Sequence, residues 1–319
     1  MENRGVNGVN YGPWLVGLGA ALWGTESAWR IPLNELFDAQ VIVFWEHVLI
    51  LLMFLPLLIS RVGEIRKIDA RTWGYLALSG FAGSAVGTVF FTLALKYGNA
   101  TVVNVVLNIQ PVISTIGAFL FFGDRLGPRF FLYAGMAIVA GVFVSVAHPT
   151  LIAVSFERAG LNRGTGYALI CALFWGLATV AGRGVMTGMS LRLASSLRIV
   201  VGTYLHDADS PRLRQAPWRG ALAGARAGTR HKGDDLAGSA RLHLWGIPFL
   251  VYFEGLRLTR ASTAGYFEMM QTLAAVCITW GFFRATLEPH QVFSGLVLIA
   301  AVAMVHRVQQ RTEQSETRR

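Results

Sequence analysis

Charge is scarce in this chain of 319 residues: only 14% of the positions are Asp, Glu, Lys or Arg, whereas 54% are hydrophobic. Soluble domains carry roughly 25% charged residues, so this composition argues against a soluble protein. The chain has two cysteines, Cys171 and Cys277, and both stand inside apolar runs. We expect them to be small packing residues, not a disulfide or a metal site.

Signatures of common enzymes are also missing. The chain contains no Gly-Lys-Ser/Thr nucleotide loop, no His-Glu-x-x-His, no Gly-x-Ser-x-Gly and no Cys-x-x-Cys. A membrane enzyme that acts on lipid would need a cluster of His, Asp or Ser at one interface, and no such cluster is visible. We therefore expect no catalytic residues, no metal and no cofactor.

The charge balance is basic, with 28 Lys and Arg against 18 Asp and Glu, which gives a formal net charge of +10. A nucleic-acid-binding protein can have such a balance, but the apolar composition favours another explanation. Membrane proteins concentrate Lys and Arg in the loops that face the cytoplasm. We therefore expect basic cytoplasmic loops and no nucleic-acid partner.

Long apolar runs recur along the chain. Residues 101–123, 130–147 and 291–305 contain no charged residue, and residues 261–283 contain only Glu268. A helix needs about 20 apolar residues to cross a bilayer. One such run could be a buried helix of a soluble protein, whereas a regular series predicts a membrane protein. The polar start lacks the basic segment of a secretion signal, so we expect the first apolar segment to be retained.

The sequence also repeats itself. Residues 20–24 read Ala-Ala-Leu-Trp-Gly, and residues 172–176 read Ala-Leu-Phe-Trp-Gly. Trp23 and Trp175 are 152 residues apart, whereas the matching Gln110 and Gln271 are 161 apart, so the second copy has a net gain of about nine residues in its middle. A duplicated apolar unit of this size is typical of a transporter built from two halves.

We expect an all-α membrane protein with ten helices, five in each copy. In the first copy the helices are predicted at residues 14–33, 39–60, 72–95, 101–122 and 128–147. In the second copy, helices can be placed at residues 165–186, 261–283 and 289–305. The predicted domains are a first repeat at 14–147, a joining loop at 148–164, a second repeat at 165–306 and a charged, frayed cytoplasmic tail at 307–319.

Basic loops orient the predicted helices. Residues 61–71, between the second and third helices, contain four Lys and Arg residues, and Arg125 and Arg129 lie between the fourth and fifth. With ten helices, these loops and the basic tail fall on one side, so both termini are predicted to be cytoplasmic. Because five is odd, the second copy must enter the membrane upside down, which makes an inverted repeat.

One stretch interrupts the second copy and disrupts the predicted helices seven and eight. From residue 205 to 242 the chain is rich in Arg, Ala and Gly. Its basic residues would lie near the outer face of the membrane, against the rule that loops rich in Lys and Arg face the cytoplasm. A natural polar loop between shortened helices is one explanation. A translational frameshift in a GC-rich gene is the other, and it is the one we favour because the stretch begins and ends abruptly.

The chain resembles the drug/metabolite transporter superfamily, specifically its EamA-type ten-helix permeases. The resemblance rests on Ala-Leu-Trp-Gly at 21–24 and its echo at 173–176, and on Ala-Leu-Lys-Tyr-Gly-Asn-Ala at 94–100. Most telling is Gly-Asp-Arg-Leu-Gly-Pro at 123–128, ahead of a glycine-containing helix. Arg198 resembles an arginine that is often found in the second helix of a repeat.

This resemblance implies two bundles around a central cavity and alternating access. It also implies export or exchange of small metabolites, of which amino acids are common examples. We expect a secondary transporter of the inner or plasma membrane whose partners are lipid, a small organic solute and, as a candidate coupling ion, protons. The chain is expected to be a monomer or a homodimer. A non-transporting or frameshift-damaged membrane protein and, less favoured, a membrane-embedded lipid enzyme are the alternatives.

Polar side chains in the fourth helix share one face. Asn104, Asn108 and Pro111 recur at helical spacing, and lipid cannot solvate such groups, so they face the protein interior or a water-filled path. We predict that these three residues line a substrate cavity. The alternative is hydrogen bonding between helices. Pro111 also removes one backbone donor, which predicts a kink.

The ninth helix occupies the matching place in the second copy. Glu268 is its only charged residue, and Gln271 lies on the same face. A carboxylate at that depth suits a proton-coupling group, and its structural alternative is an ion pair with Arg183 or Arg198. We predict Glu268 as the coupling group and Gln271 as a cavity residue.

The first helix of each copy offers further candidates. Glu26 and Arg30 are four residues apart, so we expect a local ion pair near the outer end of the helix, and Glu26 is a second coupling candidate. Trp23 and Trp175 are predicted to line the cavity and stack on cargo. For a tryptophan in the middle of a helix, packing in the core is the alternative.

Overall fold

The computed structural model describes residues 10–146, 163–208, 246–283 and 288–317, and these residues form helices without any strand. The segments that it describes confirm the all-α prediction. Six helical spans are long and apolar enough to cross a membrane: Ala39–Lys67, Ala70–Tyr97, Ala100–Phe122, Pro128–Ser145, Arg163–Gly188 and Pro289–Thr312.

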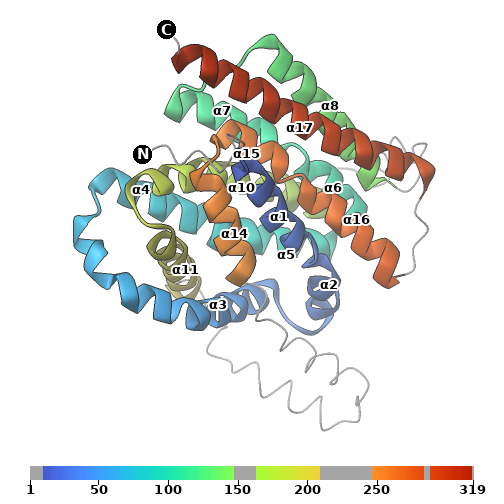
Figure 1. Cartoon of the computed structure of the whole chain (residues 1–319). Helices are drawn as coiled ribbons and strands as arrows, with labels where there is room; N and C mark the ends of the chain where they lie inside the picture. The colour runs from blue at the N-terminus through green and yellow to red at the C-terminus, as the bar shows by residue number, and fades with distance from the viewer. Residues whose placement is uncertain (1–9, 147–162, 209–245, 284–287, 318–319) are drawn as a thin grey trace.

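The first copy contains eight α-helices, a 3-10 segment and a π-helical segment (Figure 1). They are α1 (Gly12–Gly24), α2 (Ser27–Leu36), α3 (Ala39–Arg61), η1 (Val62–Lys67), α4 (Ala70–Ser79), η2 (Gly80–Gly87), α5 (Thr88–Tyr97), α6 (Ala100–Leu107), α7 (Gln110–Phe122) and α8 (Pro128–Ser145). The second copy is described as α10 (Arg163–Gly188), α11 (Leu191–Ala208), α14 (Gly246–Arg257), α15 (Ala261–Phe267), α16 (Met270–Phe283) and α17 (Pro289–Thr317).

Local chemistry explains several helix starts. The Asp69 carboxylate accepts a hydrogen bond from the backbone N–H of Thr72 at 2.6 Å and caps α4. Hydrogen bonds from Thr72 also hold the pKa of Asp69 below its ordinary value. Asn99 caps α6 in the same way, through the backbone N–H of Thr101. Pro128 and Pro289 begin α8 and α17, where the missing N–H of proline has no partner to lose.

The prediction of one continuous first helix at residues 14–33 is wrong. The helix ends at Gly24, and α2 begins at Ser27 after a short turn. In that turn the Thr25 hydroxyl bonds the carbonyl of Leu22, which offers the backbone an alternative to the helical ladder. The break matters because it moves Glu26 from the flank of a straight helix to the junction between two short ones.

The fourth and ninth predicted helices are both broken, at nearly the same place in the repeat. One break separates α6 from α7 at Asn108 and Ile109, and the other separates α15 from α16 at Glu268 and Met269. The kink expected near Pro111 is therefore present as a break before that residue. The second break has no proline, so the interruption follows the position in the fold and does not depend on proline alone.

The outer surface of the bundle is strongly apolar. Leu120, Phe293 and Ile59 expose 69%, 69% and 64% of their surface, whereas Arg30, Ser114 and Thr92 are fully buried. A soluble protein rarely exposes so much contiguous apolar surface. The arrangement suits a lipid environment, in which polar groups must be satisfied inside the protein.

Helices of the two copies pack on one another in a reciprocal pattern. α1 packs on α14, and α10, which matches α1, packs on α4, η2 and α5, which match α14. Likewise α1 packs on α15 and α16, and α10 packs on α6 and α7. The matching helices α3 and α11 contact each other, as do α8 and α17, which lie side by side at the top of Figure 1.

Contacts between distant segments also gather at the two ends of the bundle. At one end, Asn10 donates to the carbonyl of Leu258, and His306 contacts the carbonyl of Asn10. The Ser190 hydroxyl donates to Glu64.

The same end includes the loop before α8, where Ser262 donates to Asp124 at 2.5 Å. At the other end, His290 bonds the carbonyl of Val146, and the backbones of Gly98 and Gly164 approach closely.

The expectation of a frayed tail from residue 307 is wrong, because α17 continues to Thr317. Packing supports this extension: Val305 is fully buried, and Gln309 exposes only 4% of its surface. For the atypical stretch at 205–242, the structure describes only its start, where α11 continues to Ala208. Residues 209–242, like the predicted joining loop at 148–162, lie outside the described residues.

We predict that the crossing of α1 and α14 tolerates no added methyl group. A Cβ atom at Gly255 would lie 2.5 Å from the backbone nitrogen of Val16 and 2.6 Å from the carbonyl oxygen of Gly12. Gly255→Ala should therefore lower the free energy of unfolding by about 1–3 kcal/mol. Thermal unfolding in detergent measures this change. Gly135→Ala is the control, because nothing lies within 4 Å of a Cβ atom there, and equal stability of the two variants would contradict the prediction.

Candidate functional site

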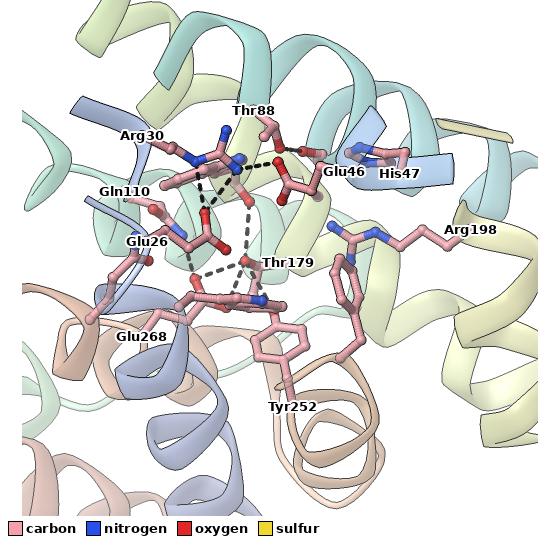
Figure 2. Close-up of a pocket in the computed structure, with 16 residues that line it drawn as sticks. Glu26, Arg30, Glu46, His47, Thr88, Gln110, Thr179, Arg198, Tyr252 and Glu268 are labelled. Atoms are coloured by element: carbon pink, nitrogen blue, oxygen red, sulfur yellow. Dashed lines mark hydrogen bonds and ion pairs between the residues drawn. The ribbon is translucent and has the colours of Figure 1, made fainter. Parts of the chain in front are cut away.

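A central cavity lies where helices of the two copies meet, and its empty space measures about 640 Å³ when the open solvent at its mouth is included. Figure 2 shows polar and aromatic side chains that converge on it from both copies. The lining residues are Trp23, Glu26, Arg30, Glu46, His47, Gly83, Thr88, Gln110, Trp175, Ala178, Thr179, Arg198, Phe249, Tyr252, Glu268 and Gln271.

Glu268 lies at the break between α15 and α16 and exposes only 8% of its surface. Its carboxylate accepts hydrogen bonds from the Tyr252 hydroxyl at 2.5 Å, from the Thr179 hydroxyl at 2.8 Å and from the side-chain amide of Gln110 (Figure 2). The donors come from α14, α10 and α7. Glu268 is thus held by neutral donors. Among the described residues it forms no salt bridge within 4.0 Å with Arg183 or Arg198, the two predicted structural partners. Arg198 does interact with Glu268 electrostatically over a longer distance.

Arg30 is fully buried and connects three helices. Its guanidinium donates to Glu46 at 2.6 Å, to Glu26 at 3.0 Å and to the Thr92 hydroxyl at 2.9 Å. The expected pair between Glu26 and Arg30 is confirmed, with Glu46 as a second carboxylate partner. One cation between two carboxylates leaves this cluster with an excess of negative charge when both are ionised.

Arg198, on α11, approaches the cavity from the side opposite Glu268 in Figure 2. Its Nε donates to the Ser84 hydroxyl at 3.2 Å, and its guanidinium lies over the rings of Phe253 and Phe249, 5.1 and 5.5 Å from their centroids. Only 7% of its surface is exposed. Among the residues that the structure describes, no carboxylate lies within 4.0 Å of its guanidinium.

A second, smaller cavity adjoins the first and shares part of its lining. Asn104, Asn108 and Pro111 line it from the broken helix of the first copy. The side chain of Asn108 donates to Ser145 at 3.3 Å, while its carbonyl oxygen has no hydrogen-bond partner. The lining shared by the two cavities is Gln110, Trp175, Glu268 and Gln271.

The structure brings all eight predicted site residues to these two cavities. Asn104, Asn108 and Pro111 line the smaller one, Trp23 and Glu26 the larger one, and Gln271, Trp175 and Glu268 both. Whether they bind a solute or carry a proton is a matter for transport measurements. For metal binding, the described residues contain no group of three or more suitable side chains.

Sequence reasoning missed several residues of the larger cavity. Gln110 was noted only as a repeat marker, although a polar residue at a broken membrane helix was a signal for the site. Glu46, an acidic residue in an apolar run, carried the same signal. Thr179 lies one helical turn after Trp175. No sequence signal pointed to Tyr252, because phenolic side chains are common in ordinary helix packing.

Comparison with known proteins now adds to this geometry. Residues 10–146 match the EamA-like transporter family. The matched residues cover the first copy of the repeat and less than half of the chain. The resemblance to the drug/metabolite transporter superfamily is therefore confirmed.

Two relatives extend the likeness beyond the first copy. The chain is 23% identical over 312 residues to the riboflavin transporter ImpX of Fusobacterium nucleatum subsp. nucleatum, which covers 93% of the chain and 98% of the relative. A solved crystal structure that is 15% identical superimposes with a TM-score of 0.65, over 96% of this chain and all of the other. That structural likeness supports the fold alone.

Family and architecture agree on the broad class. The EamA-like match and the apolar helices support a multi-pass membrane protein, and they point to a transporter of small metabolites instead of an enzyme. The polar cavity inside an apolar bundle is the feature that such a protein needs, because a solute in transit must exchange its water shell for protein groups.

Removing the cation of the Arg30 cluster should destabilise the protein. Arg30→Gln leaves the buried carboxylate of Glu46 and the partly buried carboxylate of Glu26 without compensation, so we expect the free energy of unfolding to fall by about 3–5 kcal/mol. Adding Glu46→Gln to this variant should recover part of the loss. Arg192→Gln, at an exposed position on α11, is the control. Thermal unfolding in detergent measures the stability of all three variants. If Arg30→Gln is as stable as the wild type, Arg30 does not stabilise the protein by compensating the two carboxylates.

Proposed function

We propose that this chain is a secondary transporter of the inner or plasma membrane that moves a small organic metabolite by alternating access. The observation that carries the proposal is the central cavity, which is lined by both copies and combines acidic, basic, amide and aromatic side chains. Such a site offers a desolvated solute hydrogen bonds and apolar contacts at once.

We further propose that the two copies form a ten-helix inverted repeat. Reciprocal packing supports this arrangement, since α1 meets α14 and its partner α10 meets the matching segment of the first copy. Paired breaks in the fourth and ninth helices support it as well. Broken helices at the midplane are a common feature of transporters with inverted repeats, because the interrupted backbone can contact the solute.

Both termini are proposed to be cytoplasmic. In a chain with ten crossings, the segments near Asn10, Glu64, Asp124, Ser190 and Leu258 would all lie on one side. The contacts of Asn10 with Leu258, of Glu64 with Ser190 and of Asp124 with Ser262 join these segments as this topology requires. The basic residues of the adjoining loops favour the cytoplasm for this side.

The proposed cargo is an organic solute such as an amino acid or a related metabolite, moved outward. Riboflavin is a further candidate because the relative from Fusobacterium nucleatum is named a riboflavin transporter. Trp23, Trp175, Phe249 and Tyr252 give the cavity an aromatic wall that suits flat or apolar groups. We propose that the adjoining smaller cavity, lined by Asn104, Asn108, Pro111 and Gln271, contacts the polar part of the solute.

Flux measurements test the transport function. Purified protein in proteoliposomes should show saturable counterflow of at least one solute from a panel of labelled amino acids and riboflavin. Trp175→Ala should weaken this flux about tenfold, equivalent to roughly 1.4 kcal/mol of binding free energy. Trp280→Ala is the matched control, because Trp280 is 52% exposed on the outer surface. Absence of flux across the panel would favour a non-transporting or damaged protein, and turnover of lipid would favour an enzyme.

Glu268 is the proposed coupling group, with Glu26 as the second candidate. The Glu268→Gln side chain keeps an oxygen for Tyr252 and Thr179 but cannot exchange a proton. We expect this variant to lose the dependence of flux on an imposed pH gradient while counterflow persists. Glu254→Gln serves as the control, since Glu254 pairs with Arg257 outside the cavity lining. Unchanged pH dependence in Glu268→Gln would contradict a coupling role.

A further inference from the structure

Two buried arginines border the central cavity, and only one of them has carboxylate partners. Arg30 donates to both Glu26 and Glu46. Arg198 is buried to a similar depth, yet its one hydrogen bond within the described residues goes to a neutral hydroxyl, that of Ser84. Glu268 acts on Arg198 electrostatically, but from beyond salt-bridge distance. A buried cation without an anion in direct contact is costly, so proteins seldom retain one for packing alone.

The partners of Arg198 leave its terminal nitrogens available. The bond to Ser84 uses Nε, and the rings of Phe249 and Phe253 lie beside the guanidinium without accepting a conventional hydrogen bond. Gly83 allows this placement, since a Cβ atom there would lie 2.2 Å from Nη2 of Arg198. The guanidinium is therefore held in position by surrounding groups while it lines the cavity (Figure 2).

We propose that Arg198 binds an anionic group, a carboxylate or a phosphate, of the transported solute. A guanidinium can donate two parallel hydrogen bonds to either group, and in a desolvated cavity these charge-assisted bonds are strong. The inference rests on the proposed transport function, to which it adds the chemical class of the cargo. The solute supplies the anion in direct contact with Arg198, whereas the carboxylate of Glu268 acts on it only from a longer distance.

The neighbours of Arg198 also specify the part of the solute next to its anionic group. Phe249 contacts the guanidinium and, 5.1 Å between ring centroids, also contacts Trp23. The ring of Tyr252 continues this wall, with its centroid 4.8 Å from that of Trp23, and its hydroxyl donates a hydrogen bond to Glu268. An aromatic or flat apolar body next to the anionic group fits this wall, and a hydrogen-bond donor at its far end would meet Glu268.

Binding of matched probes to the purified full-length protein in detergent tests the proposal. One pair is L-tryptophan and tryptamine, which lacks the carboxylate. The other pair is riboflavin 5′-phosphate and riboflavin, which lacks the phosphate. We expect the wild type to prefer the anionic member of at least one pair by about tenfold or more. The pair that shows the preference identifies the anion as carboxylate or phosphate.

Substitution of Arg198 should remove this preference selectively. Arg198→Gln should weaken binding of the anionic probe about tenfold or more while changing the affinity for its uncharged or decarboxylated partner little. Arg198→Lys should retain part of the preference, because it keeps the charge without the two-pronged geometry. Arg192→Gln, on the exposed side of the same helix, should behave as wild type.

Thermal unfolding without ligand separates a binding role from a packing role. If Arg198 serves to bind an anion, Arg198→Gln should be at least as stable as the wild type, because it removes a buried charge that has no carboxylate in direct contact. A large loss of stability in Arg198→Gln would overturn the proposal. So would absence of a preference for either anionic probe in the wild type, or a preference that persists in Arg198→Gln.

The same proteins in proteoliposomes distinguish the two proposals. One outcome is solute flux that does not depend on Arg198, with no preference for anionic probes. This outcome would support the transport function and exclude the anion site. Selective binding of the anionic probe without any flux would keep the anion site and exclude transport.

Discussion

Every charged side chain in the centre of this bundle needs compensation from protein groups, because the surrounding lipid offers no hydrogen bonds. Glu268 obtains it from Tyr252, Thr179 and Gln110, which come from three different helices. Arg30 obtains it from two carboxylates and a hydroxyl. The Glu268 network joins the two copies through Gln110, whereas the Arg30 cluster joins helices of the first copy. Both networks border the central cavity, so the groups that stabilise the centre of the fold also define its chemistry.

Broken helices make this arrangement possible. A continuous helix satisfies its own backbone groups and presents only side chains, whereas an interruption frees backbone groups and changes the direction of the following residues. Glu26 lies at the break between α1 and α2, and Glu268 lies at the break between α15 and α16. Both acidic residues line the central cavity. The interruptions thus place acidic groups where straight helices would have spread them along a packed face.

Much of the candidate site follows from one rule, that polar groups in apolar segments point inward. Asn104, Asn108 and Glu268 were predicted in this way, and each lines a cavity. The break in the first predicted helix did not follow from this rule, because the sequence gave no sign that the Thr25 hydroxyl would bond back to the carbonyl of Leu22. Tyr252 could not be predicted at all, since its hydroxyl meets Glu268 only after α14 packs against its neighbours.

The sequence by itself determined the class of this protein. Apolar runs, a duplicated motif and the scarcity of charge are local properties, and a helix in lipid forms from local hydrogen bonds whatever its neighbours are. Only the tertiary structure decided which polar groups meet. Gln110 and Glu268 are 158 residues apart, and Thr179 and Glu268 are 89 apart. Such contacts depend on how helices cross and where they break, and these features arise from packing between segments that no single segment specifies.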